Sequence, residues 1–562
     1  MLHLIPQVKK LEILDGAFTA RGVRYDGPAL DERVALALAD LPCASDGAPL
    51  DVVIDGDSGE GYSLILDSAA VHIRADGPAG AFYAIQTLRQ IFTHTDVPCL
   101  HIEDTPDFPY RGFYHDVTRG KVPTLDTLKA LVDEMAYYKL NSLQLYVEHT
   151  FPFTEYASVL PHTGYLTAEE LQALDAYCRL RFIEFIPSLA TFGHLFELLE
   201  QEPYRHLRVC GEDTYPNRWY ARMRHHTIDP RSEESLPIVK SLMEQYAPHF
   251  TSDYFNICCD ETFDLLTCAD QGLDVGRTYV DFVRGIIDVA RQMGKKVMMW
   301  ADILLEYPET IEMLPPDTCY LNWDYNAAPD EDKVSRFAAL GRRQIVCPGT
   351  WTWTRLCEDV TVEEQNICRM AEYGHRHGAE GVLNTNWGDW GNPCSLELAM
   401  YGLVLGAAKS WAVDTVLNED YYDAVDYLLY GHPGAVTCLK TLSTLHEQVS
   451  YWAFCSEYCV RRYGGEPTWA DPICTDAAAV QMACARLCAT LEQGPWCCDE
   501  YRREMLSATR GICLMAELSA KGQIPATVDG TAWLEDYSAR WQRKNKPDEL
   551  WRIQEMFRYM MT

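Results

Sequence analysis

The sequence has no apolar run long enough to cross a membrane, and we expect no secretory signal in its first 14 residues. A membrane-spanning helix needs about 20 consecutive apolar residues, and no such run is present. The first 14 residues include two lysines and no continuous apolar core, unlike a signal peptide. We therefore expect a cytoplasmic protein without a membrane partner.

Positive charge is also scarce. The chain has 48 lysines and arginines against 82 aspartates and glutamates, which gives a formal net charge of -34 at pH 7. Such a surface repels the phosphates of nucleic acids and of anionic membranes, so neither is an expected partner. The acids are scattered rather than gathered in a tail, which is typical of a solvated surface.

Metal and phosphate motifs are missing, and the cysteines lack a disulfide pattern. The sequence contains no Gly-rich phosphate loop and no HExxH zinc motif. Its 21 cysteines are an odd number, so we expect free thiols in a reducing compartment. Cys455/Cys459 and Cys484/Cys488 are spaced by four, but no histidine pair accompanies them, and packing explains them better than a metal. The sequence thus predicts no metal and no cofactor.

The middle of the chain, residues 106–411, alternates short apolar runs with longer amphipathic ones. Eight runs have strand character: 111–117, 141–147, 182–189, 254–259, 296–301, 318–323, 344–348 and 381–386. A helical stretch follows nearly every run, including one after the eighth. Eight strand–helix units over about 300 residues predict an α/β fold, the (β/α)8 TIM barrel. An open doubly wound sheet usually has fewer strands and a Gly-rich phosphate loop.

Two further units flank the predicted barrel. Residues 1–105 indicate a small α+β domain, with a hairpin over 62–67 and 71–75 and a helix over 80–92. Residues 412–562 are helix-rich. These C-terminal helices either shape a pocket or form the interface of a homodimer, and the sequence leaves both open.

The C-terminal ends of the predicted strands carry the side chains suited to chemistry. In TIM barrels this face holds the active site. The run 254–259 ends in two adjacent acids, Asp260 and Glu261, which point in different directions on a strand. One acid can then be protonated while the other is ionised, although a helix cap at Asp260 or Thr262 is the alternative. The other candidate residues at strand ends are Arg119, Glu148, His149, His194, Trp300, Trp323, Tyr325, Trp351, Trp387 and Asp389.

A group of indoles with acids and an arginine favours a sugar as ligand. Aromatic faces pack on the C–H faces of a pyranose, while carboxylates and guanidinium groups bind its hydroxyls. Core packing alone would not gather tryptophans at one end of the strands. Two acids are sufficient for glycoside hydrolysis, but their adjacency disfavours an acid and a nucleophile on opposite sides of the bond.

Several segments resemble, in order, motifs of glycoside hydrolase family 20, the β-N-acetylhexosaminidases. Phe255-Asn-Ile-Cys-Cys-Asp-Glu261 resembles His-x-Gly-Gly-Asp-Glu, and residues 111–119 resemble the Arg-Gly-x-x-x-Asp-x-x-Arg first strand. Residues 186–194 resemble the Pro-Glu-x-Asp-x-Pro-Gly-His segment. Residues 227–230, Met299-Trp300, 386–389 and the N-terminal segments 61–64 and 80–88 also have counterparts. The resemblance spans about residues 50–411.

The resemblance implies an exo-acting, retaining hydrolase that removes terminal GlcNAc or GalNAc from small glycosides or oligosaccharides. In that family the acetamide oxygen of the substrate attacks the anomeric carbon and forms an oxazolinium intermediate. Carried over, Glu261 is the general acid/base and Asp260 orients the acetamide N–H. Arg119 would bind ring hydroxyls and Asp389 an outer hydroxyl. The pocket walls would come from Trp300, Trp323 and Trp387. His194 would belong to a supporting polar network.

This chain departs from the family pattern close to the acids. Cysteines replace both glycines before the pair, as Cys258 and Cys259, and the histidine is Asn256. Two acids of the third-strand segment are replaced by Ser188 and Ala190. The tyrosine that binds the acetamide oxygen in the family has no clean match. After the second strand, either Glu148 or His149 faces the pocket, since neighbouring residues on a strand point oppositely.

Three other hypotheses stay open. The first is a barrel that binds sugar without cleaving it, which the retained acid pair disfavours. The second is a metal-dependent hydrolase that uses His149, His194 and the acids, with His225-His226 as further donors. The third is a retaining β-glycosidase with Glu148 or Asp324 as a protein nucleophile.

Overall fold

The computed structural model describes residues 2–20, 22–42, 47–160, 163–209, 225–268, 272–520, 530–547 and 549–562. A closed barrel of eight parallel strands forms its centre, in the order β10-β11-β12-β13-β14-β7-β8-β9. The strands are β7 (Tyr110–Asp116), β8 (Ser142–Val147), β9 (Glu184–Leu189), β10 (Tyr254–Asn256), β11 (Lys296–Trp300), β12 (Cys319–Trp323), β13 (Arg343–Cys347) and β14 (Gly381–Asn386). The predicted TIM barrel is confirmed.

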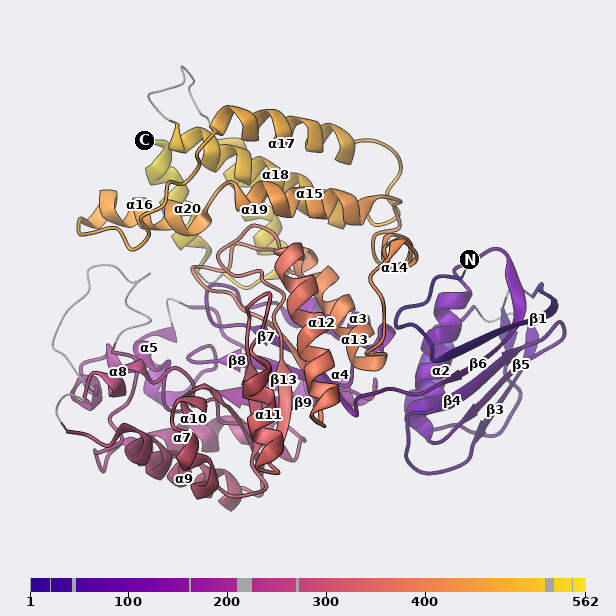
Figure 1. Ribbon diagram of the computed structural model, residues 1–562, viewed down its shortest axis with the longest axis horizontal. Coiled ribbons are helices and arrows are strands. Elements are labelled where there is room, and N and C mark those ends of the chain that lie inside the picture. Colours follow the sequence, from indigo (N-terminus) through magenta and orange to yellow (C-terminus); the bar gives the residue numbers. More distant parts are fainter. Residues whose placement is uncertain are drawn as a thin grey trace.

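Amphipathic helices surround the barrel (Figure 1). The longest of this ring, α9 (Val275–Gln292), begins at Asp274, whose side chain accepts from the backbone N–H of Arg277. It ends before Gly294, which has a φ of 78°, a conformation that glycine adopts without strain. Its valines and isoleucines are buried. The other main helices of the ring are α3 (Leu125–Tyr137), α4 (Ala168–Arg179), α7 (Ser235–Tyr246), α11 (Glu331–Ala339), α12 (Val360–Arg376) and α13 (Met400–Trp411).

The N-terminal unit is a six-stranded sheet with helices α1 (Glu32–Ala39) and α2 (Pro78–Ile91). Its strands are β1 (Lys10–Phe18), β2 (Val23–Arg24), β3 (Ala48–Ile54), β4 (Tyr62–Leu66), β5 (Val71–Ala75) and β6 (Val97–Asp104). The predicted hairpin is β4 paired antiparallel with β5. Buried ionic contacts join this unit to the barrel: Arg111 lies 2.6 Å from Glu60, and Lys139 lies 3.1 Å from Asp104.

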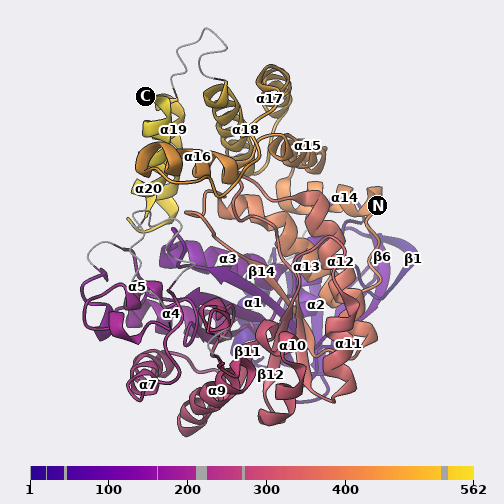
Figure 2. The ribbon, with the colours of Figure 1, turned by 60° about the vertical axis from the view of Figure 1, so that its left-hand side comes forward.

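The C-terminal helices lie across one end of the barrel (Figures 1 and 2). They are α14 (Glu419–Val425), α15 (Ala435–Glu447), α16 (Tyr451–Tyr463), α17 (Ala477–Leu491), α18 (Asp499–Ser519), α19 (Thr531–Lys544) and α20 (Leu550–Met561). None of the described helices is long and apolar enough to cross a membrane.

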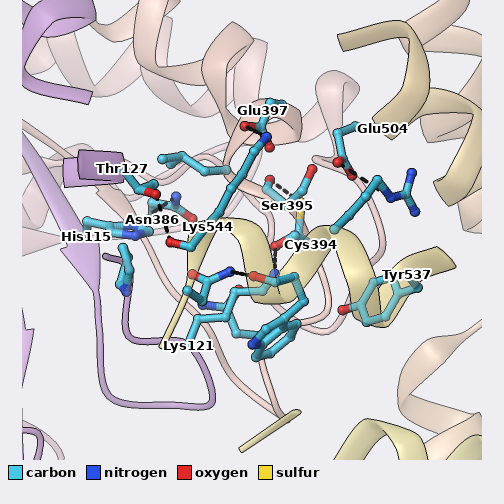
Figure 3. A pocket seen from close by; sticks show the side chains of 16 residues that line it. His115, Lys121, Thr127, Asn386, Cys394, Ser395, Glu397, Glu504, Tyr537 and Lys544 are labelled. Carbon is cyan, nitrogen blue, oxygen red and sulfur yellow. Dashed lines mark hydrogen bonds and ion pairs between the residues drawn. The ribbon is translucent and has the colours of Figure 1, made fainter. Parts of the chain in front are cut away.

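A small polar cavity of about 40 Å³ marks the junction between these helices and the barrel (Figure 3). There Lys121 donates to the carbonyl of Cys394, and its ammonium group lies 4.5 Å from the ring centroid of Trp541. Lys544 pairs with Glu397. These contacts fix α19 against loops at the C-terminal ends of the first and last barrel strands.

Candidate active site

A cavity of about 320 Å³ opens at the C-terminal ends of the barrel strands. The barrel side of its wall consists of Arg119, Asp260, Glu261, Trp300, Trp323, Tyr325, Trp353, Trp387 and Asp389. The indoles and the charged groups predicted from the strand ends therefore meet in one place. The cavity has the size of a small-molecule site.

The sequence predicted a strand that runs up to the two acids. In the structure the strand stops before it reaches them. Strand β10 stops at Asn256, because the next residues leave extended conformation: φ is 55° at Cys258, 68° at Cys259 and 49° at Glu261. Residues other than glycine in this left-handed region cost roughly 1–3 kcal/mol each. The bend explains the glycines of the family motif.

Buried contacts hold this strained bend in place. The sulfur of Cys258 lies 3.4 Å from the hydroxyl oxygen of Ser188, and that of Cys259 lies 3.4 Å from the hydroxyl of Thr191. Tyr279 donates to the carbonyl of Cys259 at 2.8 Å. Both thiols are buried, and burial raises the pKa of Cys258 well above its usual value. The cysteines are packing groups that hold the backbone turn.

His194 and Asp302 contact the acid pair from two sides. The Nε2 atom of His194 lies 3.3 Å from a carboxylate oxygen of Asp260 and 3.3 Å from one of Glu261. Burial lowers the pKa of His194, but Asp260 and Glu261 outweigh this and raise it to about 10. The two carboxylates thus favour the protonated imidazole, while the guanidinium of Arg119, 3.4 Å from Nδ1, opposes it.

Asp302 follows β11 and accepts from the backbone N–H of Glu261 at 2.8 Å. Burial, together with the nearby Asp260, raises the pKa of Asp302 to about 8. This carboxyl therefore holds its proton at neutral pH more readily than an exposed aspartate does. Asp302 was not among the predicted site residues, although its position two residues after Trp300 at a strand end was the available signal.

Arg119 lies at the centre of an ionic group at the cavity wall. Its guanidinium lies 2.9 Å from Asp389, 3.5 Å from Asp116 and 3.7 Å from Glu148. It also lies 5.1 Å from the ring centroid of Trp387. Burial opposes its charge, but Asp389 and the other acids raise the pKa of Arg119 well above its usual value. A permanently charged donor is thus fixed beside the indole.

Aromatic rings form the rest of the cavity wall on the side of the barrel. The ring centroids of Trp300 and Trp387 are 5.8 Å apart, and Trp323 stacks on Tyr325 at 5.1 Å. The indole N–H of Trp387 donates to the hydroxyl of Tyr325 at 2.7 Å. Tyr325 is the only tyrosine that lines this cavity within the described part of the chain. It is therefore the candidate for the acetamide-binding tyrosine that sequence comparison could not place.

Four of the predicted residues lie behind the wall. Glu148 is 4% exposed and accepts from the hydroxyl of Tyr146. His149 is buried behind Glu148, so neither residue after the second strand lines the cavity. His194 is also buried but reaches both acids. Trp351 instead donates to the carbonyl of Tyr325, and its neighbour Trp353 lines the cavity.

The C-terminal helices complete the cavity. Trp452 of α16, together with Arg552 of α20 and the preceding Glu549, joins Trp390 and Gly391 from the loop after β14. The sequence left open whether these helices shape a pocket or form a dimer interface. The structure gives them the first role, and a homodimer stays a prediction.

Comparisons with known proteins agree with this geometry. Residues 108–387 match the family model for the catalytic domain of glycosyl hydrolase family 20, and residues 1–105 match the model for domain 2 of that family. The chain belongs to glycoside hydrolase family 20.

Relatives within the family are distant. A β-hexosaminidase of Akkermansia muciniphila is 33% identical over 158 residues, which cover 24% of this chain and 32% of that protein. A β-N-acetylhexosaminidase of Cellulomonas fimi is 26% identical over 325 residues, which cover 54% of this chain and 61% of that protein. The matches thus span less than two thirds of either relative.

Solved structures share the fold. An exo β-N-acetylglucosaminidase of Vibrio harveyi in complex with N-acetylglucosamine has a TM-score of 0.59, 19% identity and 76% coverage of each chain. A chitobiase of Flavobacterium johnsoniae has a TM-score of 0.60 and 15% identity, with 100% of this chain and 99% of that chain covered. The second match includes the C-terminal helices.

Proposed function

We propose that the protein is an exo-acting, retaining β-N-acetylhexosaminidase that uses the acetamide of its substrate as nucleophile. One observation carries the proposal: Asp260 and Glu261 lie side by side in an indole-walled cavity, both 3.3 Å from Nε2 of His194. Family membership and relatives described as β-hexosaminidases support it.

The residues of the cavity have different roles in the proposed reaction. Asp260 accepts the acetamide N–H and so directs the acetamide oxygen to the anomeric carbon. Glu261 gives its proton to the leaving oxygen, and its carboxylate then takes a proton from the water that opens the oxazolinium ring. The configuration is retained after two inversions. Trp300, Trp323 and Trp387 pack around the sugar, while Arg119 and Asp389 bind its hydroxyls.

A protein nucleophile is a weaker hypothesis in this geometry. Glu148 lies behind Arg119 and does not line the cavity. Asp324 accepts from Lys333 at 2.9 Å and from the backbone of Asn326 at 3.0 Å, and it also lies outside the wall. Neither carboxylate is placed to attack an anomeric carbon beside Glu261.

The proposal is tested with a panel of chromogenic β-GlcNAc, β-GalNAc, β-glucoside and β-galactoside substrates. We expect turnover only of the two N-acetylated sugars, because the acetamide makes the first bond. A loss of kcat as well as a rise in KM on removal of the N-acetyl group distinguishes chemistry from recognition. Efficient β-glucoside turnover, or a covalent adduct with a 2-fluoro sugar, would overturn the mechanism.

A metal-dependent reaction is the second hypothesis to exclude by experiment. One ligand atom each from His194, Asp260 and Glu261 lies within 4.8 Å of the others. The sequence has no HExxH or similar metal-ligand spacing, which disfavours a metal there. We expect full activity after treatment with EDTA. Activity that disappears with EDTA and returns with zinc would favour the metal instead.

We also propose that the enzyme works in the cytoplasm on small glycosides or oligosaccharides. Every cysteine in the described part of the chain is a free thiol, which supports a reducing compartment. Fractionation of the cells that make it, with activity measured in each fraction, tests this proposal.

A further inference from the structure

We infer that Asp302 is a positioning residue for the proposed general acid: its side chain holds the backbone of Glu261, and this contact sets where Glu261 delivers its proton. The inference rests on the proposed function, in which Glu261 protonates the leaving oxygen. Asp302 does not line the cavity, so it acts on the substrate through Glu261.

The main chain leaves the sheet just before Glu261. Trp300, at the end of β11, donates its backbone N–H to the carbonyl of Cys258 at 3.0 Å. Beyond this bond the backbone is left-handed at Cys259 and at Glu261, so the regular pairing of parallel strands does not continue. The side chain of Asp302 replaces it, because its Oδ2 atom accepts from the N–H of Glu261 at 2.8 Å.

Asp302 belongs to the rigid side of this contact. The residue before it, Ala301, donates its N–H to a carbonyl of β12 at 3.1 Å. The residue after it, Ile303, is buried in the short helix α10 (Asp302–Glu306). Glu261 instead lies in a strained loop, and strained backbone persists only where its surroundings fix it. A side chain at the edge of the sheet can therefore hold the Glu261 backbone in place.

His194 contacts the other end of Glu261. Its Nε2 atom lies 3.3 Å from the Glu261 carboxylate, whereas Asp302 holds the main-chain N–H. One contact alone leaves the direction of a flexible glutamate side chain open, but contacts at both ends define where the carboxyl points. Proton transfer depends on this direction, because a displacement of about 1 Å can cost about 10²-fold in rate.

The acceptor oxygen of Asp302, and not its charge, makes the contact. Burial and the nearby Asp260 raise the pKa of Asp302 to about 8, which favours the uncharged carboxyl. Oδ2 accepts the bond from Glu261, and Oδ1 is buried without a hydrogen-bond partner among the described residues. Asparagine has an acceptor oxygen at the same reach and no charge. Asp302→Asn should therefore keep the contact, whereas Asp302→Leu, of similar size, removes it.

The test measures both variants on two substrates with different leaving groups. Phenyl β-GlcNAc needs protonation of its leaving oxygen, whereas 2,4-dinitrophenyl β-GlcNAc needs little. For Asp302→Leu we expect kcat/KM on the phenyl glycoside to fall by about 10²-fold, as for a misplaced catalytic group. On the dinitrophenyl glycoside kcat/KM should fall by less than about fivefold, because acid catalysis contributes little there.

The conservative variant should rescue the activity. Asp302→Asn should recover most of the loss and stay within about fivefold of the wild type on the phenyl glycoside, since the amide oxygen accepts the same bond. Glu306→Leu, at the exposed end of α10, is the matched control and should leave both kcat/KM values unchanged. If Asp302→Asn loses as much as Asp302→Leu, the inference is overturned. An equal loss on both glycosides would also overturn it, because the effect would not involve the proton donor.

A double variant shows whether Asp302 acts through Glu261. Glu261→Gln removes the proton donor, so a residue that only positions this donor has nothing left to position. Adding Asp302→Leu to Glu261→Gln should therefore change kcat/KM by less than about twofold. Two independent losses that multiply would contradict the inference. Binding of a GlcNAc-thiazoline shows that each variant retains a folded sugar site, and Asp302→Ala takes the place of Asp302→Leu if the leucine variant does not fold.

Failure of the inference and failure of the proposed function look different. If the wild type cleaves neither glycoside, the proposed function is wrong. If the wild type cleaves both and Asp302→Leu keeps the wild-type kcat/KM on the phenyl glycoside, the role of Asp302 is overturned while the function stands.

Discussion

The indole N–H of Trp387 donates to the hydroxyl oxygen of Tyr325 at 2.7 Å. The first residue follows β14 and the second follows β12, so the bond ties two loops across the mouth of the barrel. It also fixes the Tyr325 hydroxyl in the cavity wall, where we propose that it donates to the acetamide oxygen of the substrate. Burial raises the pKa of Tyr325 well above its usual value, so the hydroxyl keeps its proton.

Tyr325→Phe should lower kcat on a chromogenic β-GlcNAc substrate by about 10²-fold, within the range observed when one donor to a developing charge is removed. The fold should be unaffected, because the ring that stacks on Trp323 is retained. Tyr373→Phe, on α12 and outside the cavity, is the matched control. Equal kcat values for the two variants would show that Tyr325 contributes no hydrogen bond to the reaction.

Glu261→Gln should leave the protein folded and lower the rate by on the order of 10²–10⁴-fold, because a positioned proton donor is lost. The loss should depend on the leaving group. An activated phenol needs little protonation and should be affected least, whereas a sugar leaving group should be affected most. Measured kcat/KM values across a series of substituted phenols check this. An equal loss of kcat/KM along the series would indicate that another group donates the proton to the leaving group.

The stability of the protein should fall at alkaline pH because of a buried pair of acids outside the active site. Glu358 and Glu363 are both 0% exposed. Burial, reinforced by repulsion from Glu358, raises the pKa of Glu363 well above 4.5. The folded state thus keeps a proton that the unfolded chain releases, and the free energy of unfolding decreases as pH rises above the unfolded pKa.

Glu363→Gln removes this titration and retains the shape of the side chain. We expect the variant to be more stable than the wild type at pH 9 by at least about 1 kcal/mol, the scale of a one-unit pKa shift. The difference should shrink toward pH 5. Denaturant unfolding at both pH values measures it, with the exposed Glu466→Gln as control. A constant difference between the variants across pH would contradict a proton held by the pair.

The bend before the acid pair should tolerate glycine and reject β-branched residues. Cys258 has a φ of 55°, where a β-branched side chain is strained and glycine is not. Cys258→Val should therefore be less stable than Cys258→Gly, although valine is closer to cysteine in volume. Thermal unfolding of both variants compares them. A more stable valine variant would mean that packing rather than backbone strain dominates at this position.

The barrel was predictable because each strand–helix unit has its own local pattern. The 3.6-residue period of apolar residues is visible in segments such as α9, whose apolar side is buried. Eight strand–helix units in succession then predict a closed parallel sheet. The acid pair and the indole wall followed from their places at strand ends. Cys258 and Cys259 could not be interpreted from sequence, since only the structure shows left-handed backbone at both positions.

Other features depended on contacts that a single sequence does not contain. The alternation of strand faces could not place Glu148 or His149, because both follow the end of β8 at Val147 and lie behind the wall. Trp351 and Trp353 were indistinguishable without the bond from Trp351 to the Tyr325 carbonyl. Trp452 and Arg552 line the cavity but belong to helices far from the barrel in sequence. No local sequence pattern indicates that these helices lie at the site.

The spread of the cavity wall along the chain has a consequence for synthesis. Arg119 is made early and Arg552 more than four hundred residues later. At roughly 5–20 residues per second, the ribosome needs about 20–90 seconds to pass from one to the other. The barrel of a nascent chain can therefore close before the ribosome has made the C-terminal helices that complete the cavity wall. Until α20 is made and packs on the barrel, Asp260 and Glu261 of the growing chain lie in a cavity that lacks part of its wall.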